Sequence, residues 1–109
     1  MDWIDLHSLE QLDEINTLSQ HQAVVIFKHS TRCSISHMAK SRLEREPAPS
    51  NIPFYYLDLI QHRPISQSIA EKYDVHHESP QILIIKNGVC IYDQSHNGIT
   101  MADTKEQIQ

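Results

Sequence analysis

The chain has 109 residues, 39% of them apolar, so a single domain over residues 1–109 with a packed core is expected. Its formal charge of −5 argues against a phosphate-backbone partner, and no apolar run approaches the ~20 residues of a membrane span. The acidic N-terminal residues do not resemble a signal peptide and two cysteines form no secreted disulfide framework, so we expect a cytoplasmic protein without nucleic-acid or membrane partners.

The first half of the chain predicts two helices around a buried strand. Ser8 and Gln11 form a capping-box pattern, which predicts a helix from about Ser8 to Ser19. Residues 23–27 are apolar without alternation, as is typical of a central strand covered on both faces. A second helix is expected to end before Pro47 and to bury the apolar face Ile35, Met38, Ala39 and Leu43.

A second strand is predicted at residues 54–59. Pro64 suits the first position of the helix that follows, because its missing N–H would have no helical partner there. The apolar face of this helix is expected to comprise Ile65, Ile69 and Tyr73.

The remaining residues predict a hairpin and a terminal helix. Strand 81–86 leads through Asn87-Gly88, a strong signal for a type I′ turn, into a strand from Val89 to about Asp93. Thr100 to Asp103 form a second capping box. The resulting order, αβαβαββα, predicts an α/β fold of thioredoxin-like layout, with a four-stranded mixed sheet flanked by helices.

Cys33 is placed at a strand-to-helix junction by this arrangement. The positive end of a helix dipole and free backbone N–H groups favour a thiolate, which is the nucleophile in thiol–disulfide exchange. Positive charge could be added by four residues close by in sequence: Lys28, His29, Arg32 and His37. The alternative is an inert, partly buried thiol, since free cysteines are often buried.

The reaction of Cys33 would have to be completed by a second thiol from outside the chain. Ser36 stands where a Cys-x-x-Cys protein carries its resolving cysteine. Cys90 follows the hairpin turn, at the opposite pole of the sheet from Cys33, whereas a disulfide needs Cα atoms within ~7 Å. The pattern therefore indicates a monothiol mechanism.

Ser79-Pro80 directly precedes a strand, a position that proline tolerates. In a thioredoxin-like layout this proline is cis and lies beside the active cysteine, leaving the backbone of Ser79 to pair with an extended thiol substrate. An ordinary trans-proline is the alternative. His29, Cys33 and His37 are spaced by four, but His29 precedes the helix, so no metal site is expected.

The combined motifs resemble the signature of the bacillithiol-system redox-active proteins, the monothiol bacilliredoxin-like family. The resemblance implies a thioredoxin fold with Cys33 as redox-active thiol and Pro80 as cis-proline. The chain departs from the family at Ser34, where proline is usual, and at Asn97-Gly98, where Trp-Asp is usual. The matching stretches are 27–36, 56–60 followed by 63–66, and 77–81 running into 84–88.

The resemblance implies removal of bacillithiol from mixed disulfides on S-bacillithiolated client proteins. Bacillithiol would then be a co-substrate, with no tightly bound cofactor, and the protein is expected to be a monomer. Because bacillithiol carries a malate group, cationic side chains near Cys33 would help to bind it. Lys28, Arg32 and Arg63 are the candidates.

Two other functions fit the same cysteine. Some monothiol glutaredoxin-like proteins carry a [2Fe–2S] iron–sulfur cluster in a dimer, held by one protein cysteine and one small thiol per subunit, and Cys33 with Ser36 could do the same. Alternatively, Cys33 could act in a non-catalytic, redox-sensing binding module whose modification changes the affinity for a partner.

Overall fold

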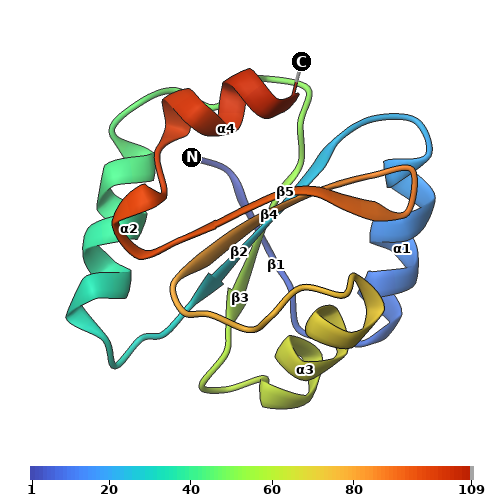
Figure 1. The fold of residues 1–109 in the computed structure, drawn as a ribbon, viewed down its shortest axis with the longest axis horizontal. Coiled ribbons are helices and arrows are strands. Elements are labelled where there is room, and N and C mark those ends of the chain that lie inside the picture. The colour runs from blue at the N-terminus through green and yellow to red at the C-terminus, as the bar shows by residue number, and fades with distance from the viewer. Residues whose placement is uncertain (109) are drawn as a thin grey trace.

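A computed structural model describes residues 1–108 of the chain. Five strands form one sheet, and four helices cover its two faces (Figure 1). No helix within residues 1–108 is long and apolar enough to cross a membrane. The elements in chain order are β1 (Trp3–Asp5), α1 (Glu10–Ser19), β2 (Val24–His29), α2 (Ser34–Glu44), β3 (Phe54–Asp58), α3 (Arg63–Lys72), β4 (Gln81–Lys86), β5 (Val89–Ser95), a 3₁₀ turn (His96–Gly98) and α4 (Met101–Ile108).

The sheet has the strand order β1-β3-β2-β4-β5. The pairs β1–β3 and β2–β3 are parallel, whereas β2–β4 and β4–β5 are antiparallel. The carboxyl ends of β2 and β3 and the start of β4 therefore meet at one edge of the sheet. We call this the carboxyl edge, and its segments are residues 30–33, 59–62 and 76–80.

The two faces of the sheet bury separate apolar clusters. Helices α1 and α3 cover one face, and α2 and α4 cover the other (Figure 1). All six residues of β2 are buried, which confirms a central strand covered on both sides. Because strand side chains alternate, Lys28 points toward α3 and the next residue, His29, points toward α2.

The expected four-stranded sheet is wrong by one strand, because β1 adds an edge strand beside β3. Trp3 anchors it. Its ring stacks on Phe27 with 5.6 Å between centroids, and its Nε1 donates a hydrogen bond to Glu44 Oε2 at 2.7 Å. A strand of three residues that ends in Asp5 shows too little alternation for its sequence to predict it.

The two capping boxes each form in part. At the start of α1, Gln11 Oε1 accepts the backbone N–H groups of His7 and Ser8, but no side chain caps the helix, which begins at Glu10 rather than Ser8. At the start of α4, Thr100 Oγ1 accepts the N–H of Asp103 at 3.1 Å.

The predicted apolar face of α2 is only half correct. Ala39 and Leu43 are fully buried, but Ile35 is 48% exposed and Met38 is 62% exposed. Ser36 occupies an inward position instead. The helix is thus rotated so that a hydroxyl, not an apolar side chain, faces the sheet near its start. The expected face of α3, formed by Ile65, Ile69 and Tyr73, is buried as predicted.

The β4–β5 hairpin turn has the predicted type I′ character. Asn87 and Gly88 have φ values of 54° and 77°, the left-handed values that such a turn requires. The Asn87 N–H donates to Ser19 O at 2.7 Å, and the Gly88 N–H donates to Ser19 Oγ at 3.0 Å. The end of the sheet opposite the carboxyl edge is therefore fastened to the last residue of α1.

Candidate active site

Cys33 caps the N-terminus of α2 at the carboxyl edge. Its backbone is extended, with φ −116° and ψ 120°, and its carbonyl accepts the N–H of His37 at 3.1 Å. Its own N–H donates to Ser30 O at 3.2 Å. No side chain caps the helix, and the thiol is free and partly exposed. The sulfur thus lies where the helix dipole favours negative charge.

A buried hydrogen-bond network lies beneath this loop. Ser36 Oγ accepts the Ser30 N–H at 2.9 Å and lies 3.0 Å from His29 Nδ1. A hydroxyl has one donor and two acceptor sites, so Ser36 can bond to the Ser30 N–H and to the His29 ring at the same time. Since Ser30 also accepts the Cys33 N–H, the network connects β2 to the residue that carries the thiol.

His29 is a neutral component of this network. Burial first, and then the neighbouring His37 and Lys40, lower its pKa from 6.5 to about 4. The ring lies 4.7 Å from that of His37, edge to face, and 5.5 Å from that of Tyr56. The expectation that His29 adds positive charge beside Cys33 is therefore wrong at neutral pH.

Ser79 and Pro80 lie at the same edge, where β4 begins. The peptide bond between them is cis. Pro80 is buried, and its carbonyl accepts the N–H of His96. The Ser79 hydroxyl is buried without a hydrogen-bond partner within residues 1–108. Since Lys28 of β2 pairs with Gln81 of β4, Pro80 lies beside the end of β2.

Lys28 lies on the other face of the sheet from His29. Its ammonium is buried and donates to Ser66 O at 3.4 Å and to His77 Nδ1 at 3.2 Å. Burial lowers the pKa of Lys28 from 10.5 to about 8. The expectation that Lys28 offers its charge directly beside Cys33 is thus also wrong, because the side chain turns away beneath α3.

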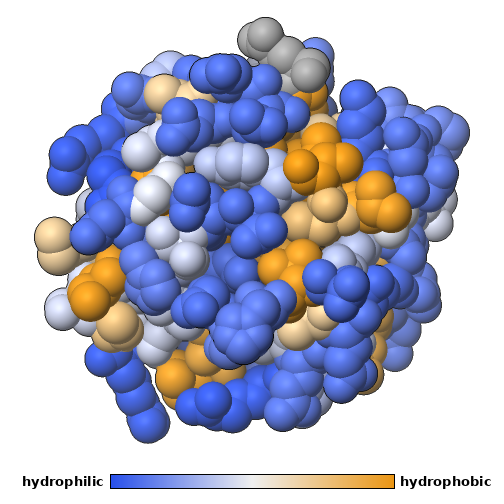
Figure 2. All heavy atoms as spheres, viewed as in Figure 1, coloured by the Kyte–Doolittle hydropathy of each residue, from blue (hydrophilic) through white to orange (hydrophobic). Residues whose placement is uncertain are grey.

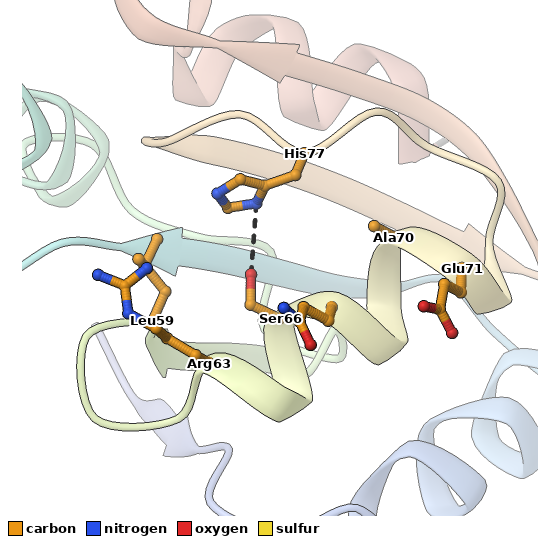
Figure 3. Close-up of a pocket in the computed structure, with 7 residues that line it drawn as sticks. Leu59, Arg63, Ser66, Ala70, Glu71 and His77 are labelled. Atoms are coloured by element: carbon orange, nitrogen blue, oxygen red, sulfur yellow. Dashed lines mark hydrogen bonds between the residues drawn. The ribbon is translucent and has the colours of Figure 1, made fainter.

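Next to this lysine is the α3 pocket, a hollow of about 490 Å³ between α3 and the segment that leads to β4. Figure 3 shows Arg63 and Ser66 on its α3 side and His77 facing them, with the His77 ring hydrogen-bonded to Ser66. The sequence singled out Arg63 but missed Ser66 and His77. Only the fold could pair them, since eleven positions of chain separate them.

The sequence comparison is unambiguous about family. Residues 4–104 match the family described as monothiol bacilliredoxin BrxC. The chain belongs to this family. A solved protein with a thioredoxin fold is similar to it at 30% identity, with a TM-score of 0.80, over 97% of this chain and 93% of that one.

More distant solved structures show the same fold. A thioredoxin from Malassezia sympodialis has 20% identity and a TM-score of 0.75 over 98% of this chain and 88% of its own. A thioredoxin from Trypanosoma brucei brucei has 16% identity and a TM-score of 0.69 over 97% and 87%. This bacilliredoxin-family chain is therefore a redox-type protein of thioredoxin fold.

The predicted site residues form two groups rather than one. His29 and Ser36 are bonded to each other below Cys33, whereas Lys28 and Arg63 lie at the α3 pocket. Arg32 is exposed in the Cys33 loop. Lys28 is separated from its neighbour His29 because successive residues of a strand face opposite sides of the sheet.

Exposed apolar side chains flank Cys33 on α2. Ile35 and Met38 project from the first two turns. Figure 2 shows apolar atoms at the left edge of the molecule, over α2, with further apolar groups right of centre and at the bottom of the same face. A partner approaching the thiol would meet this apolar surface.

Cys90 is remote from this edge. It follows the hairpin turn in β5, pairs with Ile85, and packs against the core beneath α1 and α3. Its Sγ donates to Tyr92 O at 3.2 Å, and burial raises the pKa of its thiol. In the described part of the chain, no cluster of histidine, cysteine and carboxylate side chains is arranged to hold a metal ion.

Proposed function

We propose that the protein is a monothiol thiol–disulfide oxidoreductase of the bacillithiol system, which removes bacillithiol from mixed disulfides on client proteins. The observation that carries this proposal is the presence of a thiol at Cys33 and of a hydroxyl, not a second thiol, at Ser36. A free, partly exposed thiol caps α2, and the position three residues on is a buried hydroxyl. Membership of the monothiol bacilliredoxin family supports bacillithiol as the small thiol that takes part.

The first step is attack by the Cys33 thiolate on the bacillithiol sulfur of the mixed disulfide. The old S–S bond breaks, the client leaves as a thiolate that takes up a proton, and Cys33 is left disulfide-bonded to bacillithiol. The N-terminal end of α2 favours the anionic sulfur before attack.

The second step needs another bacillithiol molecule. Its thiolate attacks the bacillithiol sulfur held on Cys33, which releases the symmetrical disulfide and regenerates the Cys33 thiolate, so electrons and sulfurs balance. Ser36 cannot perform this step, since a hydroxyl forms no disulfide. Cys90 cannot perform it either, because it packs against the core at the end of β5 that is remote from Cys33.

The mixed disulfide is an extended ligand that would lie along the carboxyl edge, beside Cys33 and Pro80. The backbone of Ser79, ahead of cis-Pro80, can pair with an extended segment of the substrate. Arg32, next to Cys33 in the chain, is exposed and can meet acidic groups of the client. The apolar Ile35 and Met38 offer contact area to the client protein.

The test uses a purified client carrying bacillithiol in mixed disulfide, excess bacillithiol, and mass spectrometry of the client. Wild type and Cys90→Ala should both restore the client thiol, with a bacillithiol adduct trapped on Cys33. Cys33→Ala should restore none. Removal that persists in Cys33→Ala overturns the proposal, and so does a wild-type protein that takes up bacillithiol on Cys33 without turning over.

A further inference from the structure

The α3 pocket contains a buried positive charge that the proposed reaction does not explain. Lys28 is fully buried, yet it forms no ion pair with a carboxylate within residues 1–108. Its partners are a carbonyl and an imidazole, both neutral hydrogen-bond acceptors. With a pKa of about 8, the amine is mostly protonated at pH 7. A buried cation without a counter-ion is costly, and an anion near by reduces that cost.

The lysine lies directly behind the pocket wall. Its two hydrogen-bond partners, Ser66 and His77, both line the pocket. Arg63, at the first position of α3, lines the same pocket and is exposed. An anion in the pocket would therefore meet a guanidinium directly and a buried ammonium across one layer of side chains.

One ring nitrogen of His77 has no hydrogen-bond partner among the described residues. Because the Lys28 ammonium can only donate, His77 Nδ1 must be the acceptor, and the imidazole proton lies on Nε2. Burial and the nearby charge of Lys28 both lower the pKa of His77, which keeps the ring neutral. In Figure 3 Nδ1 faces Ser66, and the other ring nitrogen points away from it. The Nε2–H group is thus free to bind an acceptor.

Glu71 also lines the pocket, but at its far end. It follows Arg63 by eight residues along α3, a rise of roughly 12 Å. The carboxylate would repel an anion there and leave the Arg63 end as the favourable place. That end is at the carboxyl edge, because α3 begins where β3 ends, beside the end of β2 that leads to Cys33.

We propose that the Arg63 end of the α3 pocket binds the carboxylates of the low-molecular-weight thiol that resolves Cys33. Arg63 and the His77 Nε2–H contact the carboxylates, and Lys28 acts through His77 as a positioning residue. This inference rests on the proposed function. It assigns to one pocket the selection of a dicarboxylate-bearing thiol such as bacillithiol over an uncharged one.

The first measurement is independent of redox chemistry. Free L-malate is titrated into ¹⁵N-labelled reduced protein, and amide shifts are followed by NMR. The shifts should concentrate on Arg63, Ser66 and His77, and Arg63→Gln should weaken binding roughly tenfold. Arg45→Gln, an exposed arginine at the end of α2, is the matched control and should bind like wild type. Absent shifts, or shifts that Arg63→Gln leaves unchanged, overturn the inference.

The second measurement compares rates at Cys33. Reduced protein is mixed with bacillithiol disulfide or with its analogue lacking malate, and the adduct is timed by mass spectrometry. Wild type and Arg45→Gln should prefer the malate-bearing disulfide, and Arg63→Gln should lose most of that preference. If wild type, Arg45→Gln and Arg63→Gln all show the same preference between the two disulfides, the pocket does not select the thiol. The proposed function is unaffected by that result. If wild type does not react with bacillithiol disulfide, the proposed function is wrong. The malate titration then still tests whether the pocket binds carboxylates.

Discussion

Ser36 Oγ lies 3.0 Å from His29 Nδ1, in a buried network beneath the loop that carries Cys33. The position that in a dithiol protein would hold a second sulfur here holds a hydroxyl that accepts the Ser30 N–H and is hydrogen-bonded to the His29 ring. The first prediction concerns the loss of these two hydrogen bonds.

Ser36→Ala should destabilise the fold. It leaves a buried N–H at Ser30 and a buried imidazole nitrogen at His29 without partners, and such losses cost about 1–3 kcal/mol. Urea unfolding monitored by circular dichroism measures the change. Ser41→Ala, on an exposed position of the same helix, is the control and should lie within about 0.5 kcal/mol of wild type. Equal midpoints for the two variants would count against the network.

Acid should destabilise the protein partly through His29. Its pKa is lowered on folding, from 6.5 to about 4, so the unfolded state binds more protons between these values. The stability that neutral His29 provides is complete above pH 6.5 and is lost as the pH falls toward 4. His29→Gln should flatten the pH dependence of unfolding free energy in this window. His21→Gln, at an exposed position, should leave the slope as it is in wild type.

Lys28→Met should raise stability at neutral pH, because it replaces an unpaired buried cation by an apolar side chain of similar length. The gain should be on the order of 1 kcal/mol or more. Since the pKa of Lys28 falls from 10.5 to about 8 on folding, the advantage should shrink as the pH rises through that interval. Unfolding midpoints at pH 7 and pH 10 test this. A less stable Lys28→Met at pH 7 would contradict it.

The two thiols should differ in reactivity. Cys90 is half-buried against the core, burial raises the pKa of its thiol, and its sulfur donates to Tyr92 O, whereas Cys33 ends a polar loop. Brief treatment with iodoacetamide near pH 7.5, followed by peptide mass mapping, should label Cys33 well before Cys90. The thiolate is the reacting form, so a faster Cys90 would mean that it opens to solvent.

Ser79→Ala should be close to neutral for stability, or slightly stabilising, because the hydroxyl is buried without a partner. If the substrate pairs with the backbone of residue 79, the variant should also keep its rate with bacillithiol disulfide. A rate lowered tenfold or more would show that the hydroxyl, and not the backbone, binds the substrate. Adduct formation at Cys33 provides the measurement.

The sequence predicted most of the fold because its signals are local. A continuous apolar run predicted β2, the Asn87-Gly88 pair predicted the hairpin turn, and Pro64 predicted the start of α3. It missed β1, which is held by the packing and hydrogen bonds of Trp3 with residues far along the chain.

The site was harder to predict for a related reason. Proximity in sequence suggested that Lys28 and His29 both surround Cys33, but neighbouring strand residues face opposite sides of a sheet. The partners of Lys28, which are Ser66 and His77, come from two other segments. Ile35 and Met38 match a helical apolar face, yet the hydrogen bonds of Ser36 fix the rotation of α2 and turn them outward.

The parallel pairing of β1 with β3 begins with Trp3 beside Phe54, the first residue of β3. The start of the chain therefore emerges at the amino end of β3, a full strand length from the edge where Cys33 sits, as the ribbon in Figure 1 also shows. An affinity handle fused ahead of Met1 would leave the thiol facing the solution. Immobilised in this way, the protein could serve as bait, with captured disulfide partners eluted by reductant.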